Sequence, residues 1–531
     1  MDLYLIIVII MLALAVSGLV VGVANDAVNF LNSALGSKAA PRYVIMTVAS
    51  VGIIVGAITS NGMMEVARSG VFHPEMFTFA EVMLLFLAVM FTNVILLDIF
   101  NTLGMPTSTT VSLVFGLLGA AVGISIFKIA NDALVTLPDG SLATMADMIN
   151  TGNAMAIIGG ILISVVIAFV CGTVVMYITR LIFSFRYQSK LKSYGAVWCG
   201  IALTAISYFA VFKGLKGTQV IPADWMSWME GHIPMMLGGL LVGWSLIMSI
   251  LSMLKVNILR ITVLAGTFSL ALAFAGNDLV NFIGVFVAGV DAYDIVRTTG
   301  DTNMLMGGLN DPVVANLLIL FLSGAVMVVT LWFSKKAQSV SDTEINLARQ
   351  DVGVERFGST SASRAIVRAT INCNKNYEKY TPERIQRFIA SRFVPVANAK
   401  DKAPFDLIRA TVNLTVASLL ISMATSLQLP LSTTYVTFMV AMGSSLSDRA
   451  WGRESAVYRI TGVLTVIAGW FFTALVAFTV SFAVAVLLMW GGVFAVAGLS
   501  VLCCYLMIRS TKAHRLPLPG CHWSLAMRGI L

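Results

Sequence analysis

The stretch that decides the fold is Asn25-Asp26-Ala27-Val28-Asn29-Phe30, which recurs as Asn277-Asp278-Leu279-Val280-Asn281-Phe282 with five of six residues identical. Each copy lies at the end of a long apolar run. An aspartate at the centre of a membrane helix costs about 2.5–3.5 kcal/mol on insertion scales. The repetition therefore predicts that both aspartates have partners that offset this cost.

A second motif repeats at a matching distance. Pro106-Thr107-Ser108-Thr109-Thr110 recurs as Pro430-Leu431-Ser432-Thr433-Thr434, identical at four of five positions. The separation between the motifs is 80 positions in the first half and 152 in the second, which leaves 80 when a 72-residue polar segment, 335–406, is removed. The two halves are therefore expected to be internal repeats.

The composition places these repeats in a membrane. Apolar residues make up 58% of the chain and charged residues 11%, against about 25% charged residues in soluble domains. Of the 60 charged residues, 21 lie in 335–406, which predicts one polar cytoplasmic insert. A soluble enzyme is excluded, and the scattered histidines and cysteines show neither metal-site nor disulfide spacing.

Apolar segments of membrane-spanning length recur twelve or thirteen times. They lie near residues 3–24, 44–60, 80–100, 107–127, 155–179, 196–212, 235–254, 261–282, 313–333, 407–427, 430–447, 457–480 and 484–508. This pattern predicts an all-α, polytopic integral membrane protein, built from two inverted-topology repeats with interrupted helices. We expect the first segment to be a retained span rather than a cleaved signal peptide.

The same segments divide the chain into six expected parts. These are a first transmembrane repeat (1–180), connecting helices (181–260), the first part of a second repeat (261–334), the polar insert (335–406), the remainder of the second repeat (407–508) and a basic tail (509–531). We assign the insert no chemistry, because it occurs in one repeat only and a symmetric site can be built without it.

The charges of the loops predict the orientation. Basic loops, expected in the cytoplasm, contain Lys38, Arg42, Arg180, Arg186, Lys190, Lys192, Lys255, Arg260, Arg449 and Arg453. The acidic segment 291–312 is expected outside, as is the N-terminus. The two halves are then inverted, which is typical of secondary transporters that hold substrate and coupling ions between their repeats.

The repeated aspartates are candidate cation ligands. No lysine or arginine lies within ten positions of Asp26 or Asp278, so a bound cation or a proton is expected to neutralise them. Each aspartate shares a helix face with the asparagine three positions later. A helix broken at Gly22 or Gly276 would add backbone carbonyl ligands.

The P-x-S-T-T segments are candidate anion sites. Proline suits the first turn of a helix, where unpaired N–H groups and the helix dipole attract phosphate or sulfate. The candidate substrate ligands are Asn25, Asn29, Ser108, Thr109, Thr110, Asn277, Asn281, Ser432, Thr433 and Thr434. These polar groups could instead be packing contacts, but the recurrence of both motifs disfavours that alternative.

The motif residues resemble the signature of the inorganic phosphate transporter (PiT) family. The resemblance includes the run from Gly22 to Phe30, its continuation Gly36-Ser37-Lys38-Ala39, the second copy from Gly276 to Asn281 and both P-x-S-T-T segments, and it covers about residues 1–490. It implies a cation-coupled phosphate importer. In that case Asp26, Asp278, Asn25 and Asn277 would bind the coupling ion, with sodium at the two aspartates. The Ser, Thr and Asn residues of the candidate substrate ligands, Asn25 and Asn277 included, would hold phosphate.

Three features depart from the family pattern. Eukaryotic members carry membrane glutamates where this chain reads Val51-Gly52-Ile53-Ile54 and Asn413-Leu414-Thr415, and histidine often follows S-T-T where Val111 and Tyr435 stand here. The basic tail matches nothing in the family. Coupling to a proton, coupling to a metal–phosphate complex, and a sulfate substrate therefore stay open. An ion channel is less favoured, because selectivity filters usually come from rings of subunits.

We therefore expect a multi-pass protein of a bacterial-type inner membrane that is a symporter and not an enzyme. Its partners would be phosphate, sodium and membrane lipid, with no nucleic acid, and a homo-oligomer is left open. No cofactor is expected besides the coupling ion, sodium or a proton.

Overall fold

The computed structural model of the protein describes residues 2–515 with the exception of several internal stretches. These are 61–63, 104–105, 138–139, 209–222, 312–315, 335–336, 338–340, 342–343, 346–359, 395–402, 428 and 449–454. Within the described residues the regular elements are helices, with isolated bridges in place of strands. The predicted all-α class is confirmed. Most of the basic tail lies outside the described residues.

The first half contains the helices that carry the first copy of each motif. They are α1 (Asp2–Gly36), α2 (Arg42–Ile58), α3 (Glu65–Arg68), η1 (Pro74–Met76), α4 (Phe79–Leu103), α5 (Thr109–Ala130), α6 (Met145–Met148) and α7 (Thr151–Phe183). The connecting helices are α8 (Gln188–Ile206), α9 (Ala223–Gly231) and α10 (Ile233–Met253).

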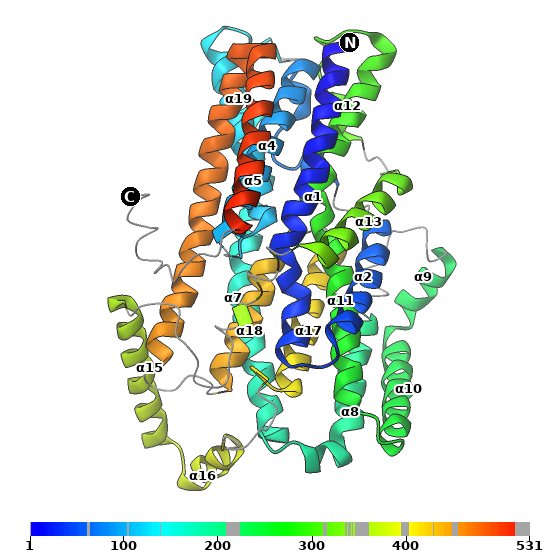
Figure 1. Ribbon diagram of the computed structural model, residues 1–531, viewed down its shortest axis with the longest axis vertical. Helices are drawn as coiled ribbons and strands as arrows, with labels where there is room; N and C mark the ends of the chain where they lie inside the picture. Colours follow the sequence, from blue (N-terminus) through cyan, green and yellow to red (C-terminus); the bar gives the residue numbers. More distant parts are fainter. Residues whose placement is uncertain are drawn as a thin grey trace.

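The remaining elements carry the second copy of each motif and lie on both sides of the insert in the sequence, or within it. They are α11 (Ile258–Leu279), the π-helical turn η3 (Val280–Gly284), α12 (Val285–Thr299), η4 (Gly307–Asn310), α13 (Leu317–Phe333), α15 (Ser361–Tyr380), α16 (Glu383–Arg392), α17 (Leu407–Ser426), α18 (Thr433–Ser447) and α19 (Ser455–Arg515). Helix α19 turns back at Gly492, whose φ is 51°, and Figure 1 shows its two arms in orange and red.

Each of the thirteen predicted segments overlaps a helix, although parts of two of them, 209–212 and 313–315, lie outside the described residues. The last predicted segment, 484–508, contains the turn of α19 at Gly492 rather than lying on one arm. Eight helices of the described chain are long and apolar enough to cross a membrane, and α2 and α13 are shorter apolar helices. The chain is therefore a multi-pass membrane protein. In Figure 1, α1 descends from the N-terminus, whereas α11 and α12 ascend, as inverted repeats require.

The two S-T-T helices pack against helices from the opposite half. Helix α5 lies along α19, and α18 lies along α7. A Cβ atom added to Gly119 of α5 would lie 2.2 Å from the Phe478 carbonyl oxygen, and one added to Gly443 of α18 would lie 2.3 Å from that of Phe169. Both glycines come ten positions after the first threonine of their S-T-T segment, Thr109 or Thr433. These equivalent contacts support the predicted inverted repeats.

Buried ion pairs connect α7, α17 and the end of α18. At the end predicted to be cytoplasmic, Arg180 of α7 contacts Asp448 at 2.9 Å and Asp406 at 2.7 Å, while Arg409 of α17 contacts Asp448 at 2.6 Å. Since removing one member would leave a buried charge unpaired, this cluster fixes the relative positions of α7, α17 and α18.

The polar insert contacts the helix bundle near both of its ends. Glu344 is 2% exposed, and its Oε1 accepts a hydrogen bond of 2.6 Å from Asn32 Nδ2 of α1. The ring of Phe405 packs so closely on Gly36 that an added Cβ there would lie 2.4 Å away. Between these contacts, α15 and α16 lie at the periphery, far from the N-terminus (Figure 1). The middle of the insert thus lies at the edge of the bundle, where the buried Ser363 of α15 accepts a hydrogen bond of 2.9 Å from Thr461 of α19.

Candidate functional site

Helix α1 carries the first aspartate motif without a break. The expected interruption at Gly22 is wrong, because this glycine serves packing: a Cβ there would lie 2.0 Å from the ring of Phe282 in η3. The break expected at Gly276 is also wrong, since α11 continues through it. The distortion comes later, in η3, which contains Asn281. Such π-helical turns are frequent at functional sites.

The S-T-T segments begin α5 and α18, as predicted. The N-cap side chains are Ser108, which accepts from Val111 N at 3.1 Å, and Ser432, which accepts from Tyr435 N at 3.2 Å. The prolines lie two residues before these caps, so their predicted place in the first helical turn is wrong. The first turns consist of the threonine pairs, whose hydroxyl groups point to the aspartates.

Each aspartate is held by one threonine from its own half and one from the other half. Asp26 accepts from Thr109 and from Thr434, both at 3.0 Å. Asp278 accepts from Thr433 in a short hydrogen bond and from Thr110 at 3.3 Å. The first threonine of each pair contacts its own aspartate and the second crosses over. The site is thus built at the interface between the halves.

The second asparagine of each motif reinforces this crossing. Asn29 Nδ2 donates to Thr434 Oγ1 at 3.1 Å, and Asn281 Nδ2 donates to Thr110 Oγ1 at 3.0 Å. Asn281 also donates to Asp278 at 2.8 Å. These asparagines therefore hold the crossing hydroxyl groups in place.

The first asparagine of each motif holds the segment before an S-T-T helix. Asn25 Oδ1 accepts from the backbone N–H of Thr107 at 3.0 Å. Asn277 Nδ2 donates to the Leu431 carbonyl oxygen at 3.1 Å and to Asp278 at 3.0 Å. Each aspartate motif thus contacts the S-T-T motif of its own half twice. The aspartate accepts from the first threonine, and the asparagine bonds to the backbone of the residue before the serine.

The structure brings all twelve predicted site residues into one buried region. Hydrogen bonds link Asp26 and Asp278: Thr109 donates to Asp26, and Asn281 Nδ2 donates to both Thr109 and Asp278. Among the described residues, the ion pairs of the protein include neither of them. No group of three or more histidine, cysteine, aspartate or glutamate side chains gathers in this part of the chain. Two carboxylates in one buried site need a cation or a proton to neutralise them.

A comparison with protein families decides the identity of the fold and its broad role. The family model described as the phosphate transporter family matches residues 22–337, which contain both motifs of the first half and the second aspartate motif. The chain belongs to the phosphate transporter family.

Two individual proteins are similar to this phosphate transporter family member. The Thermococcus kodakarensis protein named "Putative phosphate permease TK2061" is 25% identical over 200 residues, which are 37% of this chain and 45% of that protein. The match thus spans less than half of that relative. A solved structure described as "The sodium-dependent phosphate transporter" is 16% identical and matches with a TM-score of 0.63 over 90% of this chain and 98% of that one. This likeness shows the fold.

Helix α4 adds two site residues of this phosphate transporter family member that were not predicted from the sequence. Asn101 accepts from Asn25 Nδ2 and donates to the Val21 carbonyl oxygen, both at 2.7 Å. Asn93 Nδ2 donates to the Asn281 carbonyl oxygen at 3.1 Å. Asparagine inside an apolar span is itself a signal of function, but neither residue is repeated in the second half, so the repeat comparison does not reveal them.

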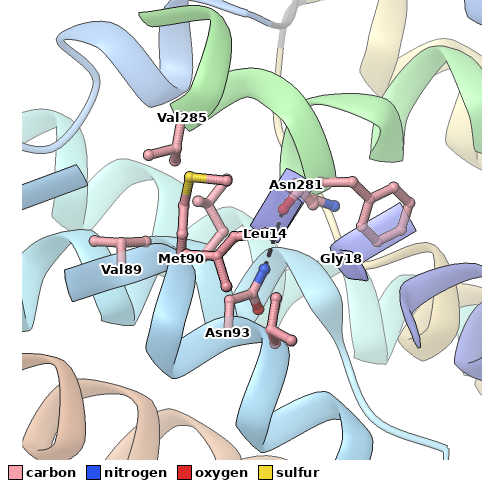
Figure 2. A pocket seen from close by; sticks show the side chains of 10 residues that line it. Leu14, Gly18, Val89, Met90, Asn93, Asn281 and Val285 are labelled. Atoms are coloured by element: carbon pink, nitrogen blue, oxygen red, sulfur yellow. Dashed lines mark hydrogen bonds between the residues drawn. The ribbon is translucent and has the colours of Figure 1, made fainter. Parts of the chain in front are cut away.

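A small cavity of about 10 Å³ lies beside Asn281. Figure 2 shows Asn93 and Asn281 at this cavity, joined by the hydrogen bond from Asn93 Nδ2 to the backbone carbonyl oxygen of Asn281, with apolar side chains of α1, α4 and α12 around them. Its lining comprises Leu14, Gly18, Val89, Met90, Asn93, Val94, Leu113, Asn281, Phe282 and Val285. A space of this size holds about one water molecule.

Proposed function

We propose that this protein imports inorganic phosphate by symport with sodium, through alternating access. The observation that carries the proposal is the crossing of the threonine hydroxyl groups onto Asp26 and Asp278. Ligands bound there would contact both halves at once. A change in the relative position of the halves would then open the site to one side of the membrane or the other.

The anion would bind at the first turns of α5 and α18. Both helix N-termini meet at Asp26, because Thr109 begins α5 and Thr434 lies in the first turn of α18. Two helix dipoles and their unpaired N–H groups favour an anion there. Ser108 and Ser432 orient these turns as N-caps rather than lying at the centre of the cluster.

Sodium would bind at Asp26 and Asp278, with amide oxygens of Asn25 and Asn277 as further ligands. Carboxylate and amide oxygens are the hard ligands that such ions prefer. The sodium charge would offset the repulsion between phosphate and the two carboxylates, which couples the two ligands. The sodium dependence of the structural neighbour supports this choice of ion; a proton or a metal–phosphate complex is the alternative coupling partner, and sulfate the alternative substrate.

The family and the fold are those of a transporter rather than an enzyme. The multi-pass architecture places the chain in a membrane. Location in a bacterial-type inner membrane, the predicted orientation, the six-part division of the chain and assembly into homo-oligomers belong to the proposal.

The proposal is tested by uptake of labelled phosphate into proteoliposomes under separate sodium and pH gradients, with sulfate as competitor. We expect uptake to follow the sodium gradient and to be little affected by excess sulfate. Full inhibition by equimolar sulfate would contradict the phosphate assignment. Uptake driven by a pH gradient without sodium would contradict sodium as the coupling ion, but it would not contradict phosphate as the substrate.

A further inference from the structure

Phosphate and sulfate have the same shape but differ in one feature that a protein can recognise. Near neutral pH phosphate keeps at least one proton, whereas sulfate carries none. A site that accepts phosphate and rejects sulfate therefore needs a hydrogen-bond acceptor for the P–OH group. An acceptor that faces an unprotonated sulfate oxygen is left without a partner and repels it, which is a strong basis for discrimination.

The two aspartates are poorly placed to supply that acceptor. Asp26 already accepts two threonine hydroxyl groups. Asp278 accepts two more, together with the amide groups of Asn277 and Asn281. Their charges would also be neutralised by the coupling ion. An acceptor for the substrate proton is therefore to be sought elsewhere in the site.

Two amide oxygens beside the site are available. Asn93 Oδ1 and Asn281 Oδ1 have no hydrogen-bond partner among the described residues, although these two residues are only 6% and 3% exposed. Both residues line the small cavity shown in Figure 2. Within the same described part of the chain, Asn277 Oδ1 is likewise unpaired, but this residue does not line the cavity.

The orientation of both amide groups is set by their nitrogen atoms. Asn93 Nδ2 donates to the Asn281 carbonyl oxygen at 3.1 Å. Asn281 Nδ2 donates to Asp278 at 2.8 Å and to Thr110 at 3.0 Å. Turning either amide over would place an oxygen against these acceptors. The oxygen of each group is therefore the atom left for a donor such as P–OH.

The cavity also lies beside the expected path of the substrate. Leu14 and Gly18 precede Asp26 on α1, so the cavity is on the side of the aspartates toward the N-terminal end of that helix. The loop charges predict that this side faces outward. Asn281 reaches from the cavity to the hydroxyl group of Thr110, at the first turn of α5.

We propose that Asn93 and Asn281 accept the proton of phosphate through their side-chain oxygens, and that Asn93 is a specificity-determining residue that selects protonated tetrahedral oxyanions over sulfate. This inference rests on the proposed phosphate transport. It assigns the selectivity to neutral amide oxygens, so selection against sulfate persists when the carboxylates are neutralised by the coupling ion.

The test is the Asn93→Leu variant, which keeps the approximate size of the side chain and removes the acceptor. Labelled-phosphate uptake into proteoliposomes is competed with sulfate and with arsenate, which carries a proton as phosphate does. We expect the half-saturating phosphate concentration to rise about tenfold and the preference for phosphate over sulfate to fall about tenfold or more. The preference between phosphate and arsenate should stay as in the wild type.

The matched control is Thr92→Val on the same helix. Thr92 is buried, but its hydroxyl group donates to the Ala88 carbonyl oxygen of its own helix at 2.9 Å, and it does not line the cavity. Its phosphate, sulfate and arsenate preferences should match those of the wild type.

If Asn93→Leu does not fold, as judged by size-exclusion chromatography, Asn93→Ser provides the test. Its hydroxyl group can donate as well as accept, so sulfate should compete better while arsenate competes as before. Unchanged rejection of sulfate by a folded variant would overturn the inference. A wild-type protein that takes up no phosphate would overturn the proposed function instead, so the two failures are distinguishable.

Discussion

At the residue scale, the two aspartates have equivalent threonine partners but different amide partners. Asp278 accepts from Asn277 and Asn281 in addition to its threonines. In the other motif, Asn29, the equivalent of Asn281, donates to Thr434. Asn29 in turn accepts from Thr437 at 3.1 Å. The carboxylates carry the charge that would attract a cation, and the threonines carry the hydroxyl groups that would hold an anion. Substitutions can therefore separate the two roles.

Replacing Asp278 with asparagine should mainly weaken sodium dependence, because it removes the charge and keeps the size. Replacing Thr433 with valine removes a buried donor, a loss of about 1–3 kcal/mol, and should mainly raise the phosphate concentration for half-maximal uptake. Each change will also weaken the other ligand, since linkage is reciprocal. The measurement is therefore the ratio of the two effects in proteoliposome uptake.

Thr330→Val is the control for this pair, because that buried hydroxyl group bonds only within α13, to the Val326 carbonyl oxygen, at 2.8 Å among the described residues. It should leave both dependences as in the wild type. If Asp278→Asn and Thr433→Val insert properly and also keep both dependences, the motifs are packing contacts and the assignment of ligands is wrong.

At the element scale, close helix contacts set the positions of α5 and α18. Gly119 and Gly443 let each helix approach a partner from the other half until backbone atoms touch. Gly22 similarly admits Phe282 against α1. The sequence showed these glycines, but whether a glycine breaks a helix or admits a neighbour depends on what packs against it. That is why the breaks at Gly22 and Gly276 were predicted wrongly.

Gly119→Ala and Gly443→Ala should each lower the free energy of unfolding by about 1–3 kcal/mol, because the added methyl group overpacks a tight contact. The control is Gly238→Ala in α10, where an added Cβ meets nothing within 4 Å. There alanine should be neutral or stabilising, since it favours the helix. Thermal unfolding in detergent measures all three, and equal stability of the three variants would rule out the tight contacts.

The contact between the insert and α1 should depend on pH. Burial raises the pKa of Glu344 to about 7, and the hydrogen bond from Asn32 opposes this rise. The ordinary value is about 4.3, so the docked carboxyl group binds its proton more tightly than a released one. Stabilisation of the contact is complete below the ordinary value and is lost as the pH rises through about 7.

Hydrogen exchange at the end of α1, corrected for the intrinsic rate, should therefore show less protection at pH 8 than at pH 6. Glu344→Gln should stay protected at both pH values, because the side chain is neutral. Glu383→Gln, at an exposed position paired with Arg387, should keep the wild-type response. Protection that does not vary with pH in the wild type would rule out the titration of this contact.

At the scale of the whole molecule, much of the architecture follows from the sequence. The repeats, the helical segments and the helix starts at the S-T-T motifs could be predicted, because each depends on local composition or on identity between two stretches. The pairing of threonines with aspartates could not be predicted, since Thr110 and Thr434 bond to aspartates of the opposite half, which are far away in the sequence. The burial of Glu344 in a polar insert carries no local signal either.

The insert can be tested as a unit. Replacing 360–394 with a flexible linker removes α15 and α16 but keeps Glu344 and Phe405, which contact α1. We expect transport to remain measurable, because the site is built from helices outside the insert. A well-expressed deletion that binds no phosphate would show that the peripheral helices contribute to the site.

The central claim is that phosphate and sodium cross the membrane together at Asp26 and Asp278. The most direct measurement is the influx of labelled sodium into sodium-free proteoliposomes before and after external phosphate is added. The account predicts that phosphate accelerates sodium influx in the wild type, and that Asp278→Asn abolishes this acceleration. Sodium influx that is the same with and without phosphate, in vesicles that do take up phosphate, would contradict it.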